Sequence, residues 1–201
     1  MVSVSTAGAA GTLRVQVWRK LRSLGALYLQ QSVCLLPARD EVVREVRRLL
    51  DRVHHQGGSG RLLRIALTAA GEQAQVIKEM NAARDAEYAE VLERLPAFGE
   101  ELATERARGR ATYAEVEESE ADLERFRSWL AKIAARDYFD APGGVVAREA
   151  VERAAAALAE FEAEALSVEA PLESTPAQST SDAASARAGG RSSRLRLVDE
   201  S

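Results

Sequence analysis

The most distinctive functional pattern in the sequence is a row of arginines spaced four residues apart. Arg44, Arg48 and Arg52 repeat at i, i+4, so a helix would place all three on one face. Like charges at this spacing oppose helix formation by roughly 0.2–0.5 kcal/mol per pair, and Asp40 and Asp51 offset only part of that cost. Such a row can contact the phosphates of a nucleic acid, or it can be an ordinary solvated helix face.

A second group of basic residues precedes this row, and together the two groups give the chain an uneven charge. Residues 1–64 hold 11 Lys/Arg and 4 Asp/Glu, whereas residues 84–125 hold 6 basic and 13 acidic residues. The positive part could meet an anionic partner such as DNA, or it could pair with the acidic part of the same chain. The predicted contacts to a DNA backbone are Arg14, Arg19, Lys20, Arg22, Arg44, Arg48 and Arg52.

The densest group of carboxylates lies between residues 115 and 124. Carboxylates in pairs can bind a divalent metal or transfer protons, but a carboxylate-bridged metal bundle would also need a Glu-x-x-His element. The only histidines, His54 and His55, are far away in the sequence. We therefore predict no metal ligands, and we expect these acids to pair with basic residues of the first 64 or with Arg106, Arg108, Arg110 and Arg125.

No other motif predicts catalysis or a cofactor. Cys34 lies in an apolar run with no matching Cys or His, which favours a buried, unreactive thiol. The glycines at 57, 58 and 60 follow a predicted helix, whereas a phosphate-binding loop would precede one. No acidic residue precedes Asp40, which argues against a metal-dependent nuclease. We expect no catalytic residue, no cofactor and no enzymatic activity.

The elements that position the basic residues follow from hydrophobic spacing. A helix is predicted after Thr12, two short strands over residues 26–37 with a kink near Gln31 and Ser32, a second helix from Asp40, and a strand over 62–68. Val2 and Val4 alternate weakly and suggest a short first strand. The resulting order, (β)αββαβ, predicts a ferredoxin-like module over residues 1–69.

The rest of the chain is predicted to be helical and then unstructured. Helices are expected over residues 72–95, 97–107, 113–136 and 145–166, with Pro96 separating the first two. From about residue 167 onward the sequence is rich in Ser, Thr, Ala and Pro. The predicted fold class is therefore α+β, with a basic ferredoxin-like module at 1–69, an acidic helical extension at 70–166 and a disordered tail at 167–201.

The composition of the chain predicts the cellular compartment in which the protein acts. The chain has a single cysteine, no run of about 20 apolar residues, and an N-terminal stretch without the features of a signal peptide. These features favour the cytoplasm and no contact with a membrane.

Three segments together resemble the N-terminal domain of the ChrB family of chromate-resistance regulators. They are RVQVWRKLRSLGALYLQQSVCLLP at 14–37, MNAARDAEYAEVLE at 80–93 and EVEESEADLERFRSWLAKIAARDYF at 115–139, and their order and spacing look like that family over about residues 12–140. The resemblance implies a cytoplasmic transcriptional regulator linked to a chromate efflux system, which binds DNA at the promoter of that system.

The sequence departs from the family pattern in two places. ChrB proteins commonly open with a hydrophobic strand, where this chain has VSVSTAGAA, and they commonly carry a C-terminal domain that the family links to the chromate response, where this chain has the predicted tail. Chromate as an effector is therefore not carried over from the resemblance. The alternative to a DNA-binding regulator is a stand-alone interaction or scaffold module, which could act as a homodimer.

Overall fold

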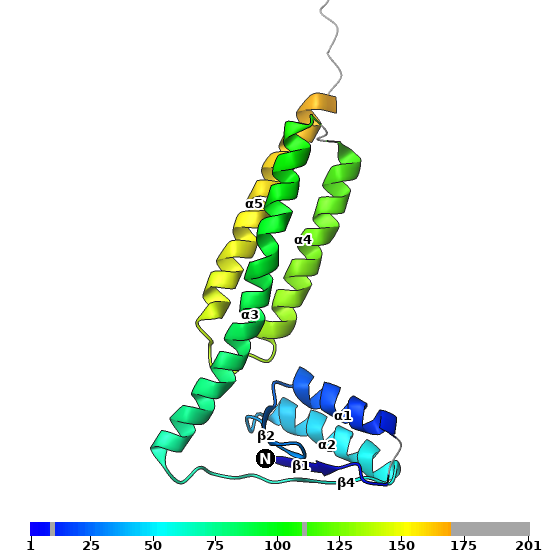
Figure 1. Cartoon of the computed structure of the whole chain (residues 1–201), viewed down its shortest axis with the longest axis vertical. Coiled ribbons are helices and arrows are strands. Elements are labelled where there is room, and N and C mark those ends of the chain that lie inside the picture. The colour runs from blue at the N-terminus through cyan, green and yellow to red at the C-terminus, as the bar shows by residue number, and fades with distance from the viewer. Residues whose placement is uncertain (9–10, 110–111, 170–201) are drawn as a thin grey trace, which may run out of the picture. The chain divides into compact units, whose positions relative to one another are not determined.

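The computed structural model describes residues 1–8, 11–109 and 112–169. Six elements form a small sheet with two helices, and three long helices follow (Figure 1). In chain order the elements are β1 (Val2–Ser5), α1 (Gly11–Ser23), β2 (Leu27–Gln30), β3 (Val33–Leu35), α2 (Asp40–His55), β4 (Ser59–Leu62), α3 (Ala70–Ala107), α4 (Tyr113–Ala134) and α5 (Gly143–Glu169).

The sheet is antiparallel, with its strands in the order β2-β3-β1-β4. Strand β1 lies inside the sheet, because Val2 is paired with Cys34 on one side and with Leu62 on the other. Val2 and Val4 are buried, whereas Ser5 on the opposite face is exposed, as the two-residue period of a strand requires. The weakly predicted first strand is therefore present, and the predicted pair of strands on either side of residues 31–32 is confirmed.

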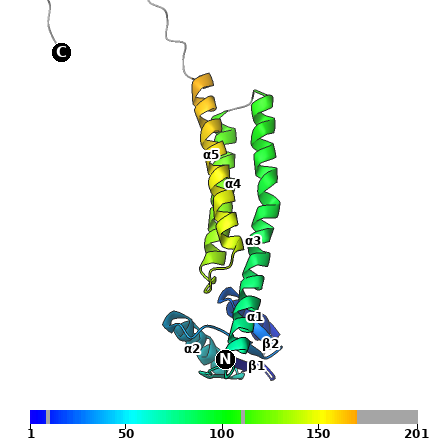
Figure 2. The ribbon, with the colours of Figure 1, turned by 90° about the vertical axis from the view of Figure 1, so that its left-hand side faces the viewer.

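Helices α1 and α2 pack side by side on the face of the sheet that carries Val2 and Val4 (Figures 1 and 2). Both helices are amphipathic, so each buries one stripe of apolar residues and leaves the opposite side in solvent. The predicted stripes are confirmed. The buried residues are Leu13, Val17 and Leu21 in α1 and Val42, Val46, Leu49, Leu50 and Val53 in α2.

The predicted fold class is wrong. Within the described residues there are five helices, the strands contain only three or four residues each, and α3 alone contains 38. The chain is mainly helical with a small antiparallel sheet, rather than a ferredoxin-like module with an extension. The helical extension itself is present. The strands are short because a strand exists only where a partner supplies hydrogen bonds.

The last predicted strand illustrates this error. It was expected at residues 62–68, but β4 covers Ser59–Leu62. The register places Leu62 opposite Val2, and one further hydrogen bond joins the N–H of Leu63 to the carbonyl oxygen of Met1 at 2.9 Å. Residues after Leu63 run past the end of β1, so their apolar side chains have no strand beside them and no ladder forms.

Pro96 does not end the helix in which it lies, contrary to the prediction. A proline inside a helix costs about 3 kcal/mol, because it lacks an N–H and its ring crowds the carbonyl four residues earlier. Leu95, Phe98 and Leu102 around it are all buried against α4 and α5. Burying each such side chain contributes about 1.5–3 kcal/mol, which together outweighs the proline. Helix α3 therefore continues through Pro96 as one element.

Helices α3, α4 and α5 lie side by side in both ribbon views (Figures 1 and 2) and share one apolar core. Its most buried large side chains are Tyr88, Val91, Ile133 and Phe161. The predicted helices at 113–136 and 145–166 are confirmed with small shifts of their ends. The predicted tail lies, from residue 170 onward, outside the described residues.

The segment between α4 and α5 joins the helical bundle to the α/β part of the chain. Tyr138 donates a hydrogen bond from its hydroxyl to the carbonyl oxygen of Leu24 at 3.0 Å, and its own carbonyl accepts one from Arg39 at 2.9 Å. Beside this contact, Glu87 of α3 binds both Arg84, at 3.1 Å, and Arg136, at 2.9 Å. Apart from the Arg84–Glu87 pair, which spans three residues of one helix, these interactions join residues distant in sequence, and no sequence pattern predicts them.

Candidate nucleic-acid interface

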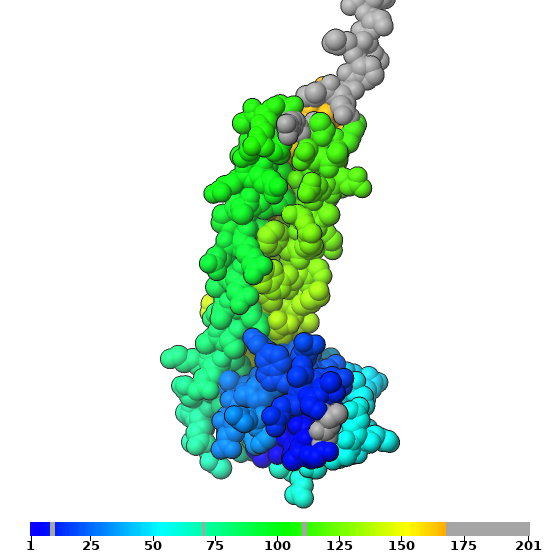
Figure 3. Space-filling model, turned by 45° about the vertical axis from the view of Figure 1, so that its right-hand side comes forward, coloured from blue at the N-terminus to red at the C-terminus, as the bar shows by residue number. Residues whose placement is uncertain are grey.

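The candidate interface is the solvent side of α1 and α2. Because the apolar stripes of both helices face the sheet, their polar sides are left in solvent together. Figure 3 shows the surface of α1 in dark blue. Six of the seven predicted DNA contacts are exposed, namely Arg14, Arg19, Arg22, Arg44, Arg48 and Arg52, and Lys20 is partly buried.

The arginine row of α2 forms as its spacing predicts. Arg44, Arg48 and Arg52 stand one turn apart, opposite the buried stripe of the same helix. A similar row runs along α1, where Arg14, Trp18 and Arg22 are also spaced by four residues. Each row exposes two or three guanidinium groups along a helix, which is an arrangement that can follow a phosphate backbone.

Glu45 joins the two helices and was missed in the sequence. Its carboxylate lies 2.6 Å from the ammonium of Lys20 in α1 and 2.6 Å from the guanidinium of Arg48 in α2. The hydrogen bond and the charge of Lys20, followed by those of Arg48, lower the pKa of Glu45. Glu45 therefore holds Lys20 and Arg48 together and reduces their repulsion. The Glu45–Arg48 spacing of three residues is the sequence signal for half of this arrangement.

Arg14 lines a hollow of about 760 Å³ on another side of α1. Arg14 and Trp18 line the hollow, and the guanidinium of Arg22 stacks 5.2 Å from the centre of the Trp18 ring. Val15, Trp18 and Leu29 expose 45%, 46% and 52% of their surface there, which is unusual for large apolar residues so close together. The seven predicted residues lie on the same two helices but do not form one cluster: Lys20 is joined to the α2 row through Glu45, and Arg14 and Arg22 lie near Trp18.

Two other arginines, one directly before α2 and one within it, differ in whether their side chains are free to contact a nucleic acid. Arg39 is engaged, because it donates to Tyr138 and lies 5.1 Å above the ring of that tyrosine. Arg47 is exposed and has no ion-pair partner within the described ranges. Arg47 was missed because it falls outside the four-residue repeat, although it directly precedes Arg48.

The acidic cluster of α4 pairs less than predicted. Arg125 binds Asp122 as expected, but Arg106 binds Glu164 and Arg108 binds Glu105, which lie outside the cluster. Arg110 lies outside the described residues. In the part of the chain that the structure describes, no group of three or more His, Cys, Asp or Glu side chains is arranged to hold a metal ion. Besides Asp122, the acidic cluster of α4 consists of Glu115, Glu117, Glu118, Glu120 and Glu124.

Cys34 is buried in the sheet, with 1% of its surface exposed, as the sequence predicted. Burial raises the pKa of its thiol to about 11, so at pH 8 the thiol is protonated as well as inaccessible. We expect Ellman's reagent at pH 8 to react with Cys34 more than about a hundredfold slower than with the chain in 6 M guanidinium. Reaction of the native protein at the unfolded rate would show that the β3 region opens freely.

None of the described helices combines the length and the apolar character that crossing a membrane requires. Comparison with curated proteins and with solved structures gave no match. A family model described as "Protein ChrB, N-terminal" matches residues 14–171, which include α1, α2, the bundle and the segment that joins them. The chain therefore belongs to the family of the ChrB N-terminal domain.

Proposed function

We propose that this protein is a ChrB-type transcriptional regulator that binds DNA through α1 and α2, in the cytoplasm and without enzymatic activity. The observation that carries the proposal is the pair of exposed basic rows on two adjacent helices. Phosphate contacts made by such rows supply affinity and orientation but carry no information on base sequence. The link to chromate resistance rests on the family alone, so the proposal does not depend on chromate as the effector.

To test the proposal, a fluorescently labelled DNA duplex from upstream of the gene's own operon is titrated with the protein at salt concentrations between 50 and 200 mM. Fluorescence anisotropy measures the binding. Each phosphate contact contributes about −0.9 to the slope of log K against log salt. The Arg44→Ala/Arg48→Ala/Arg52→Ala variant is expected to bind about 10- to 100-fold more weakly at 100 mM salt, with a slope that is shallower by about 2.7.

A matched control removes the same charge elsewhere. Arg127, Lys132 and Arg153 are exposed residues of α4 and α5, and replacing all three by alanine changes the net charge equally. This variant should bind like the unmodified protein, apart from a small change from long-range attraction. Equal losses in both variants, or no binding at low salt, would remove the basis for the proposed interface.

The second candidate function is an interaction or scaffold module without DNA binding. The observation that favours it is the exposed apolar group Val15, Trp18 and Leu29 between α1 and β2. Such patches are typical of surfaces that bind another protein or a second copy. Light scattering after size exclusion tests self-association, and under this hypothesis the Trp18→Ala variant converts a dimer into a monomer. If the wild-type protein is a monomer and does not bind DNA, self-association is ruled out, and the interaction module would have to bind a different protein.

A further inference from the structure

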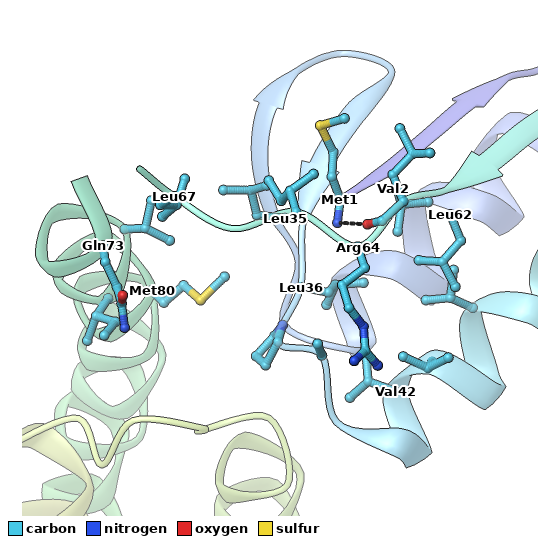
Figure 4. Close-up of a pocket in the computed structure, with 18 of the residues that line it drawn as sticks. Met1, Val2, Leu35, Leu36, Val42, Leu62, Arg64, Leu67, Gln73 and Met80 are labelled. Carbon is cyan, nitrogen blue, oxygen red and sulfur yellow. Dashed lines mark hydrogen bonds between the residues drawn. The ribbon is translucent and has the colours of Figure 1, made fainter. Parts of the chain in front are cut away.

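A second hollow, separate from the arginine rows of α1 and α2, has the composition of a ligand site. It has a volume of about 410 Å³ and lies between the N-terminal half of α2, the residues after β4, and the beginning of α3 (Figure 4). Small-molecule sites usually measure about 300–1,000 Å³ and combine apolar walls with a few polar groups. The size of this hollow therefore suits a compact organic molecule.

The walls of this hollow are almost entirely apolar. Apart from Arg47, Arg64 and Gln73, every side chain that lines it is apolar, and none is acidic. Met1 also carries the N-terminal ammonium, which donates a hydrogen bond to the carbonyl oxygen of Leu63 at 2.9 Å. Leu63 and Ile65 follow the end of β4 and leave 43% and 45% of their surface exposed. The backbone of Leu63 pairs with Met1, and Ile65 has no strand beside it. A bound apolar group would remove this surface from water, which contributes about 25 cal/mol for each square ångström.

The positive charge of the hollow determines which head group an apolar ligand should carry. Arg47 and Arg64 are exposed, and neither has an ion-pair partner among the residues whose positions are described. Figure 4 shows the Arg64 side chain extending beside Val42 on the α2 side, with Gln73 on the opposite α3 side. Two unpaired guanidinium groups beside an apolar surface favour a carboxylate over a neutral or cationic head group, because guanidinium binds carboxylate through charge-assisted hydrogen bonds.

We propose that this hollow binds small amphipathic carboxylates, in which an acyl or aryl body contacts the apolar walls and the carboxylate meets Arg47 and Arg64. The proposal does not depend on DNA binding, because it concerns a different surface and a different ligand. Its charge disfavours organic cations, and its volume suits short acyl or aryl bodies.

The chain contains a convenient reporter for this site. It has only two methionines, Met1 and Met80, and both line the hollow. Labelling the methionine methyl groups with ¹³C therefore gives an NMR spectrum in which the signals come from the proposed site itself. Octanoate, octanol and octylammonium serve as three probes that share a chain length and differ in charge.

Octanoate is expected to shift the Met80 methyl signal in a saturable way, with an affinity about tenfold higher than that of octanol, and octylammonium should bind most weakly. The Arg47→Gln/Arg64→Gln variant should lose the preference for octanoate over octanol while still binding octanol. The Ala38→Trp variant, which places a large side chain at the wall, should weaken all three probes.

An Arg127→Gln/Arg153→Gln variant provides the control for net charge, because these arginines lie on the bundle and outside the hollow. It should retain the preference for octanoate. Three results would overturn the proposal: no saturable shift of Met80, octylammonium binding as tightly as octanoate, or an unchanged preference in the Arg47/Arg64 variant. None of these results bears on the DNA titration, so failure of one proposal is distinguishable from failure of the other.

Discussion

The Glu87→Ala variant is expected to lose about 3 kcal/mol of unfolding free energy, one of the two largest effects predicted for a single substitution in this protein. Glu87 binds two guanidinium groups, and the side chains of Glu87, Arg84 and Arg136 are only 16%, 9% and 18% exposed. Removing the carboxylate leaves two largely buried cations close together, and only the charge of Asp137, which is not in direct contact, still attracts Arg84. Burial already lowers the pKa of Arg84, which shows that its environment disfavours the charged form.

Glu45 provides the matched comparison. It also binds two cations, Lys20 and Arg48, at 2.6 Å each, but Arg48 is 72% exposed and Glu45 itself is 32% exposed. Water therefore replaces the lost carboxylate, and Glu45→Ala should cost far less than Glu87→Ala. Urea unfolding followed by circular dichroism measures both variants. Equal losses would show that the Glu87 pairs are as well solvated as those on the surface.

The Gly25→Ala variant is expected to lose at least about 2 kcal/mol of unfolding free energy. Gly25 has a φ of +73°, where an L-residue costs about 1–2 kcal/mol. A Cβ at this position would also lie 3.0 Å from the carbonyl oxygen of Arg136 and 3.0 Å from a guanidinium nitrogen of Arg84. The Arg136 oxygen belongs to the backbone and cannot move aside, so the α/β part and the bundle would have to separate locally.

Gly57 separates the two contributions. Its φ is +80°, but a Cβ there would have no neighbour within 4 Å. Gly57→Ala should therefore cost only the conformational part, about 1 kcal/mol. Thermal unfolding of both variants gives the difference that is due to the contact with Arg136. If the two variants lose the same unfolding free energy, the neighbours of Gly25 can move to accommodate the Cβ without a loss of stability.

Much of the local structure could be predicted from hydrophobic spacing. The spacing of Val42, Val46, Leu49 and Val53 correctly predicted helix α2. The same spacing predicted that Arg44 and Arg48 are exposed to solvent. These predictions succeed because an amphipathic helix must bury its apolar side whatever it packs against. Spacing failed where a partner decides the outcome, as for the strand expected at residues 62–68 and the break expected at Pro96.

The predicted interface was incomplete for the same reason. The arginine rows lie within single helices, so their geometry follows from local spacing. The bridge from Lys20 to Glu45 connects two helices, and the hollow beside Arg47 and Arg64 is lined by residues of β1, β3, α2, β4, α3 and the segments that follow the strands, with Phe139. Contacts of this kind depend on which elements pack together, which no periodicity within one element can encode.

The sequence by itself determined the helices α1, α2, α4 and α5, the uneven charge, the burial of Cys34 and the resemblance to the ChrB N-terminal domain. Each of these depends on residue type or on spacing within one segment. Only the tertiary structure decided that α3 passes through Pro96, that β4 stops at Leu62, and that Arg136 pairs with Glu87. These features depend on burial and hydrogen bonding between segments distant in the chain, whose energies outweigh local preference.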